Sequence, residues 1–168
     1  MNVYLKISLS LIFAIFFFIL MQLVLFKFFY IGNIKDHFNF TYDSYYWNTH
    51  NFIPFHTFFS YLFYSNDLHL NIRLQNVGGN LVGFIPFGFI LPLLFTKFMS
   101  TLKIGMATFF LSLFFEVSQL LFKLGSFDVD DIFLNTLGGI IGFFAVKFAL
   151  KLLQSIKRAR LQVITKNQ

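Results

Sequence analysis

The stretch around which the chain is organised reads Glu116-Val-Ser-Gln-Leu-Leu-Phe-Lys-Leu-Gly-Ser-Phe-Asp128-Val-Asp-Asp-Ile-Phe-Leu-Asn135-Thr-Leu-Gly-Gly139. It begins inside one apolar segment, passes through an acidic corner at 128–131, and enters a second apolar segment that carries Asn135. Charged and amide side chains are costly in apolar surroundings unless they have partners. The stretch therefore predicts that the polar cluster of this protein lies where these two apolar segments meet.

The composition around this stretch is typical of a membrane protein. The chain has 168 residues, of which 57% are hydrophobic and only 12% charged, and its mean hydropathy is +0.72. Apolar runs of this length exceed the needs of a soluble core. The absence of cysteine excludes disulfides and thiolate metal sites. The net charge of +6 lies mainly beside apolar segments, which favours a juxtamembrane role over nucleic-acid binding.

We therefore expect an all-α integral membrane protein, with residues 1–168 in a single domain and four transmembrane helices in an antiparallel bundle. The expected spans cover residues 7–26, 76–95, 104–122 and 131–150. Each is long enough to cross a hydrocarbon layer of about 30 Å at 1.5 Å per residue. The first span lacks the short core and small-residue cleavage site of a signal peptide, so we interpret it as a retained anchor. Pro86 predicts a kink in the second span.

Residues 30–75 form the only long polar stretch and are expected to be an extracytoplasmic loop after the first helix. Tyr and Trp side chains at 42–47 suit the level of the lipid headgroups. Residues 51–63 are apolar but too short to cross, so this part should lie in the interface or dip in and return. All four histidines fall in the loop, but their irregular spacing does not predict a metal site.

The distribution of basic residues predicts the orientation. Four spans place both termini on one side of the membrane. With the termini inside, nine of the 13 basic residues are cytoplasmic, and the basic tail at 151–168 contributes most of the bias: Lys6, Lys97, Lys103, Lys147, Lys151, Lys157, Arg158, Arg160 and Lys166. The positive-inside rule therefore favours cytoplasmic termini, with the loop and the acidic corner outside.

Three of the spans each carry a narrow polar or small stripe at helical spacing. The stripes consist of Ser112, Glu116, Gln119 and Lys123, of Asp131, Asn135, Gly138 and Gly142, and of Asn76, Asn80 and Gly83. Offsets of four and seven residues lie on one helix face, and the amides fall about 6 Å below the outer boundary, with Glu116 at about 10 Å. We expect a polar pocket open to the outer leaflet. Its expected ligand-binding residues are Asn76, Asn80, Glu116, Gln119, Asp128, Asp131 and Asn135.

Two interpretations of Glu116 remain open. A charged acid near the centre of a membrane helix costs about 2.5–3.5 kcal/mol on insertion scales, so such residues usually face the bundle and mark a function. Glu116 either faces a ligand or substrate, or it only hydrogen-bonds Asn80 and Asn135 as a packing contact.

Three interpretations of the acidic corner are open as well. Asp128 suits the N-cap of the last helix, and Asp131 stands where a capping box has an acid. The surplus aspartate allows oxygen ligation of Mg²⁺ or Ca²⁺, or contact with a cationic ligand. The order of residues is not that of an EF-hand loop. Two small-xxx-small pairs, Gly79 with Gly83 and Gly138 with Gly142, predict close helix contacts.

At these residues the chain resembles the VanZ-like family. Four blocks carry the resemblance in order over about 90 residues: Asn51-Phe-Ile-Pro-Phe55, Asn76-Val-Gly-Gly-Asn-Leu-Val-Gly-Phe-Ile-Pro-Phe-Gly88, Glu116-Val-Ser-Gln119 and Phe127-Asp-Val-Asp-Asp-Ile-Phe-Leu-Asn-Thr-Leu-Gly-Gly139. Many members have an Arg two or three residues before the first aspartate of the corner, where this chain has Gly125 and Ser126. The resemblance implies a small multi-pass protein of the bacterial cell membrane, linked to lowered susceptibility to teicoplanin-type lipoglycopeptides.

Three functions follow as alternatives. The first is an envelope accessory protein whose pocket binds a lipid, a lipid-linked cell-wall precursor or an acyl-bearing antibiotic. The second is a membrane enzyme that acts on a lipid headgroup with Glu116 or an aspartate as general acid or base, although no nucleophile motif or metal signature supports it. The third is a proton-coupled carrier, for which four spans are few unless the protein forms a homo-oligomer. We expect no cofactor, no metal and no nucleic-acid partner.

Overall fold

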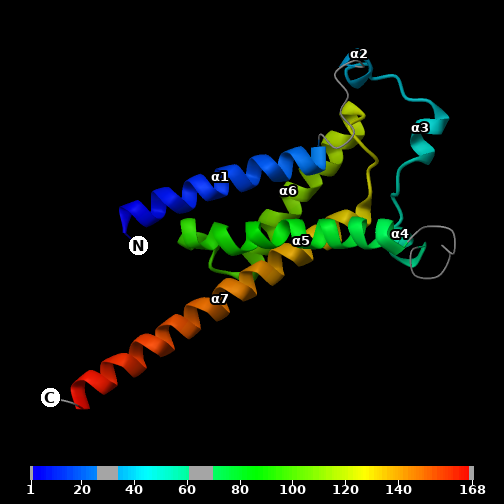
Figure 1. Ribbon diagram of the computed structural model, residues 1–168. Helices are drawn as coiled ribbons and strands as arrows, with labels where there is room; N and C mark the ends of the chain where they lie inside the picture. The colour runs from blue at the N-terminus through cyan, green and yellow to red at the C-terminus, as the bar shows by residue number, and fades with distance from the viewer. Residues whose placement is uncertain (1, 26–33, 61–69, 167–168) are drawn as a thin grey trace.

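The computed structural model of the chain describes residues 2–25, 34–60 and 70–166. Within these ranges the long helices are α1 (Val3–Leu25), α5 (Leu70–Leu94), α6 (Thr101–Phe122) and α7 (Val129–Lys166). Each of the four is long and apolar enough to cross a membrane, which confirms the expected all-α membrane class. Both termini lie at one end of the molecule, and the short helices α2, α3 and α4 lie at the other, called here the loop end (Figure 1).

All four long helices begin before their expected spans, and α5 and α7 depart most from them. α5 begins at Leu70, so the last part of the expected 30–75 loop is helical, and the helix runs through Pro86 and Pro92 without a break. α7 continues to Lys166, so the basic residues after 150 extend this helix instead of forming a separate tail. No Gly or Pro follows Gly142 to end it. Its 38 residues give about 57 Å at 1.5 Å per residue, roughly twice the hydrocarbon thickness.

α5 and α7 form the most extensive helix–helix contact, and glycines permit it. A β-carbon added at Gly88 would overlap the carbonyl oxygen of Gly139, and one at Gly142 would overlap that of Ile85. The Gly138–Gly142 pair thus lies in a close helix contact, as predicted. The expectation for Gly79 is wrong, because a β-carbon there would have nothing within 4 Å. Without water to drive association, membrane helices rely on such small residues to approach closely.

Phenylalanine fills the core between these helices. Phe84, Phe115 and Phe143 are at most 1% exposed, and the rings of Phe84 and Phe115 meet edge to face at 6.2 Å. α1 joins this core through Leu20 and Leu25, while most of its other apolar side chains are exposed. In a bilayer these exposed side chains face lipid.

The described part of the long loop is tied to the C-terminal end of α6. It contains α2 (Ile34–His37), α3 (Ser44–Asn48) and α4 (His56–Phe59). The last carbonyls of a helix lack partners within it, and here the loop supplies them. The hydroxyl of Tyr46 donates to Leu120 O, that of Tyr42 donates to Leu121 O at 2.9 Å, and His37 Nδ1 lies 3.1 Å from Phe122 O.

Lys123 ends α6 in a left-handed conformation with φ 52°. Its Nζ donates to Thr41 O at 2.8 Å and lies 5.3 Å from the ring centre of Tyr42. Burial, with a smaller effect of Tyr42, raises the pKa of Tyr46 to about 12, so its hydroxyl remains a donor at neutral pH. These contacts place α3 beside the turn between α6 and α7, where the polar cluster lies.

Candidate functional site

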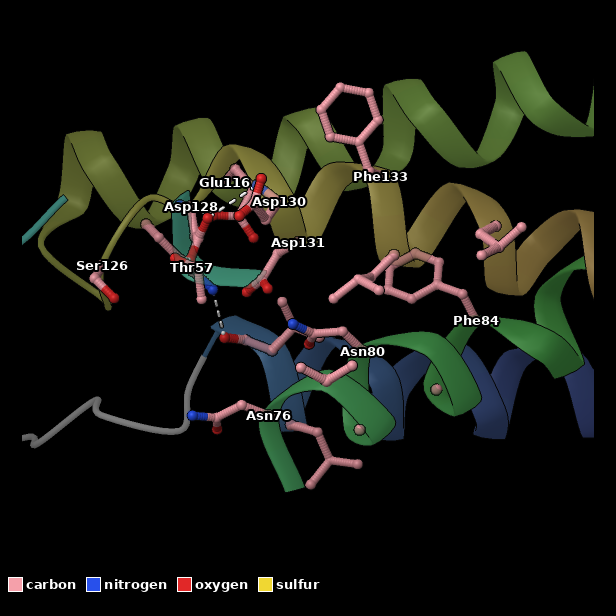
Figure 2. Close-up of a pocket in the computed structure, with 18 of the residues that line it drawn as sticks. Thr57, Asn76, Asn80, Phe84, Glu116, Ser126, Asp128, Asp130, Asp131 and Phe133 are labelled. Carbon is pink, nitrogen blue, oxygen red and sulfur yellow. Dashed lines mark hydrogen bonds between the residues drawn. The ribbon is translucent and has the colours of Figure 1, made fainter. Parts of the chain in front are cut away.

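A cavity of about 660 Å³ lies at the loop end of the bundle. α1, α4, α5, α6 and α7 all contribute to its lining. Figure 2 shows Glu116 and the three aspartates gathered at one end, Asn76 and Asn80 across from them, and Phe84 farther along the cavity. The cavity therefore has a polar end at the α6–α7 turn and an apolar end between α1, α5 and α7.

Six of the seven expected site residues line this cavity: Asn76, Asn80, Glu116, Gln119, Asp128 and Asp131. The seventh, Asn135, is not part of the lining, which corrects the expectation for this residue. It is 1% exposed, and its Nδ2 donates to Ser112 Oγ at 2.8 Å in the α6–α7 interface. About two turns beyond Asp131, α6 and α7 are so close that a β-carbon on Gly139 would overlap Thr108.

Glu116 lines the polar end of the cavity. It lies on α6, six residues before the helix ends at Phe122. Its side chain is only 2% exposed, and its Oε2 accepts the backbone N–H of Asp128 at 2.9 Å. The other oxygen, Oε1, accepts no hydrogen bond from the residues that the structure describes. Packing against Asn80 and Asn135 is thus not how this acid is held; the start of α7 holds it.

Asp128 is the N-cap of α7, as the sequence predicted. Its Oδ1 accepts the backbone N–H of Asp130 at 2.9 Å, which satisfies one of the free donors of the first turn. The same carboxylate also receives Asn51 Nδ2 at 2.8 Å and the hydroxyl of Thr57 at 2.6 Å. A parallel bridge joins Asn51 and Asp128, with Asn51 N–H donating to Phe127 O at 2.8 Å. The loop is therefore fastened to the acidic corner by both backbone and side chains.

Asp130 holds α4 over the cavity. It is 4% exposed, and its two oxygens accept the backbone N–H groups of Phe55 and Phe58. Phe55 has φ 65°, a left-handed conformation that is unfavourable for a phenylalanine. The bonds to Asp130 compensate for this strain and leave Phe55, Thr57 and Phe58 as lining of the cavity. The apolar 51–63 stretch therefore borders the cavity through these three residues.

Gln119 joins α6 to α1 at the edge of the cavity. Its Nε2 donates to Val24 O at 2.9 Å, near the C-terminal end of α1. A β-carbon at Gly125 would lie 3.3 Å from the amide of Gln119, so this turn closes tightly around it. The amide has a structural contact and also borders the cavity.

Sequence reasoning missed the residues that connect the loop to the cavity: His50, Asn51, Phe55, Thr57, Phe58, Ser126 and Asp130. His50 Nδ1 accepts the backbone N–H of Phe127 at 2.8 Å, and burial lowers the pKa of its imidazole. A signal for part of this set was present, because Asn51-Phe-Ile-Pro-Phe55 is one of the family-like blocks. Its spatial partner was not apparent from spacing, since Asn51 and Asp128 lie 77 residues apart.

The lining combines four carboxylates with amide and apolar side chains. Asp128 accepts the Asp130 amide at the start of α7, which supports the capping interpretation for this residue. Asp130 accepts two amides of the loop, and Glu116 accepts that of Asp128. Among the described residues, no group of three or more His, Asp or Glu side chains is arranged to hold a metal ion. What the lining offers a ligand is hydrogen-bond acceptors and amides at one end and apolar surface at the other.

Comparisons with known proteins agree with the resemblance found in the sequence. The model of the VanZ/LLP1 family matches residues 13–151. The chain belongs to the VanZ/LLP1 family. This range contains every residue that lines the cavity and ends where the basic extension of α7 begins. The VanZ/LLP1 assignment, together with the four apolar helices, identifies a VanZ-like, multi-pass membrane protein of the envelope.

One curated relative is protein VanZ of Enterococcus faecium, which is 38% identical over 63 residues. The match covers 38% of this VanZ/LLP1 chain and 38% of that protein, so the chain spans well under two thirds of the relative's length. No solved structure matches the chain.

Proposed function

We propose that the loop end of this VanZ-family protein faces the outside of the cell and binds an acyl-bearing amphiphile in its cavity. Lowered susceptibility to teicoplanin-type lipoglycopeptides is the proposed consequence. The amphiphile is the antibiotic itself, a membrane lipid or a lipid-linked cell-wall precursor. The observation that carries the proposal is a cavity with buried Glu116 at one end and apolar helix surface at the other.

The size and position of the cavity support binding. Its volume of about 660 Å³ is within the roughly 300–1,000 Å³ of ordinary ligand sites. Leu23, Phe133 and Leu137 line it and are each about half exposed or more, so the apolar end is accessible from the side of the bundle. An acyl chain can therefore enter from the bilayer while its head remains at the polar end.

The proposed orientation rests on charge. The start of α1 and the end of α7 lie opposite the loop end (Figure 1), where the lining residues of the cavity gather. Most basic residues belong to the end opposite the cavity, six of them in Lys147–Lys166. The positive-inside rule then places the termini in the cytoplasm and the cavity at the outer leaflet. A reporter fused after Gln168 tests this directly: activity of a cytoplasm-specific reporter is expected, and activity of an exterior-specific one contradicts the orientation.

Drug susceptibility tests the function. A deletion strain is complemented at matched expression with the wild type, Glu116→Gln or Asp131→Asn, and growth inhibition by a lipid-tailed and a tail-less glycopeptide is measured. The wild type is expected to raise the inhibitory concentration of the lipid-tailed drug several-fold more than that of the tail-less drug, and Glu116→Gln to lose most of this difference. Equal shifts for both drugs would contradict the proposal.

A further inference from the structure

We infer that the amphiphile bound in the cavity carries a protonated amine in its head group, with its apolar chain along α5 and α7. The inference rests on the proposed function and specifies the ligand of the same site. The proposed function does not say whether the head group is a cationic amine or an anionic phosphate, and the inference chooses the amine.

The first argument is the charge of the lining. Among the lining residues that the structure describes, four carry carboxylates and none is Lys, Arg or His. A phosphate head at this end would meet like charges in surroundings of low polarity, where repulsion is stronger than in water. An ammonium group is attracted by the same charges.

The second argument is the unfilled bonding capacity of Glu116. This residue is only 2% exposed and borders the cavity. Oε2 accepts the N–H of Asp128, and Oε1 accepts nothing from the described residues. An acceptor of a largely buried side chain that faces a cavity is unfavourable unless a donor reaches it there. An ammonium group has three N–H donors and no acceptor, so it complements this oxygen.

The third argument is the path that remains for the chain. Figure 2 shows Phe84 farther along the cavity from Glu116, and Leu20 and Leu137 add further apolar surface to the lining. Gly79 and Gly83 on α5 leave this path wide, since neither would place a β-carbon in close contact with a neighbour. The amine thus lies near the acidic corner, and the alkyl chain follows the apolar wall toward the bilayer.

The test uses three single-chain amphiphiles with the same twelve-carbon chain and different heads: a primary ammonium, a neutral sugar and a phosphate. Binding to the full chain in neutral-lipid nanodiscs is measured by native mass spectrometry or calorimetry. The ammonium probe is expected to bind at least about 10-fold more tightly than the phosphate probe. Glu116→Gln should weaken ammonium binding by about 10-fold and leave sugar binding unchanged.

Two further variants keep the test decisive. Asp43→Asn removes one negative charge at the loop end but outside the cavity, where Asp43 caps α3, and should leave all affinities unchanged. Asn80→Lys places a positive charge in the lining and should reverse the order of the ammonium and phosphate probes. Thermal melting of each variant shows whether it is folded, and Asn80→Lys decides the question if Glu116→Gln does not fold.

The outcomes separate the two proposals. Equal ammonium and phosphate affinities, tighter phosphate binding, or ammonium binding that ignores both Glu116→Gln and Asn80→Lys overturns the amine inference and leaves the proposed function standing. Failure of all three probes to bind, or binding that persists when Gly79→Phe fills the cavity, overturns the proposed function itself.

Discussion

The contact between α5 and α7 differs sharply between its two ends. Toward the termini, Gly88 on α5 and Gly142 on α7 bring the two helices so close that any side chain at these positions would overlap the backbone of the other helix. At the loop end of the same helices, Gly79 lines a cavity, and a β-carbon added there would have nothing within 4 Å. The comparison teaches that the tight end holds the helices in place, so the open end keeps its cavity without collapsing.

The largest expected effect comes from breaking the tight end. Gly88→Leu forces the backbone of Gly139 away, and we expect a loss of roughly 3 kcal/mol or more, because a side chain cannot displace backbone cheaply. The measurement is thermal melting of the purified protein, followed by circular dichroism and size exclusion. The matched control is Gly79→Leu, at the open end of the same helix, which should melt within a few degrees of the wild type. Equal losses for both variants would remove the distinction between the two ends.

A smaller loss of stability is expected from releasing α4, the short helix that Asp130 holds over the cavity at the open end. Asp130→Ala removes the acceptors of the Phe55 and Phe58 amides, and hydrogen bonds to charged groups contribute about 1.5–3 kcal/mol. Hydrogen exchange at these two amides should accelerate, while exchange in the Gly88–Gly142 contact stays slow. Asp43→Ala, which uncaps α3 instead, is the control and should leave the α4 amides protected. Unchanged exchange at Phe55 and Phe58 in Asp130→Ala would show that Asp130 does not hold α4.

Asn135, in the closed α6–α7 interface, and Asn80, in the cavity lining, allow the closed and open parts of the bundle to be compared directly. Asn135→Ala leaves Ser112 without its buried partner and should cost about 1–2 kcal/mol of stability without a specific effect on ligand binding. Asn80 lies in the cavity lining, so Asn80→Ala should weaken ligand binding and leave the stability unchanged. Melting temperature and probe affinity, measured on the same samples, distinguish them. If Asn135→Ala weakens binding at full stability, Asn135 belongs to the site after all.

The smallest predicted effect is a pH dependence at the loop end. Burial lowers the pKa of His50 below its ordinary 6.5, so the undocked loop binds a proton more readily than the docked one. Docking is therefore fully stabilised above pH 6.5 and weakens as the pH falls below that value, because a protonated Nδ1 no longer accepts the N–H of Phe127. Protection of the Phe127 amide, corrected for intrinsic exchange, should be constant above about pH 6.5 and fall as the pH is lowered further.

His50→Gln should abolish this dependence, whereas His56→Gln, at an exposed position on α4, should retain it. A pH profile that is the same in the wild type and in His50→Gln would assign the effect to another group.

The sequence predicted the membrane class, the four helices and the family from apolar run lengths and ordered motifs, because these depend on local composition. The ends of the helices were less predictable. α5 begins at Leu70 and α7 runs on to Lys166, since a helix can continue past the apolar stretch where no Gly or Pro ends it.

Which glycine or amide faces which neighbour depends on the helix crossing, which spacing does not specify. Gly79 and Gly88 both stand in helical positions of one segment, yet only Gly88 meets α7. Asn135 shares a stripe with Asp131, yet α6 closes over it. The partners of Asp128 and Asp130 come from the loop about 75 residues away, and no local pattern predicts such a contact.

The most direct test of the central claim is to fill the cavity without disturbing the fold. Gly79→Phe places a ring in open space on the cavity wall, and the purified variant should melt like the wild type. In the complemented deletion strain at matched expression, it should abolish the extra protection against the lipid-tailed glycopeptide and leave growth with the tail-less drug unchanged. Full protection by a folded Gly79→Phe protein would show that the cavity is not where this protein acts.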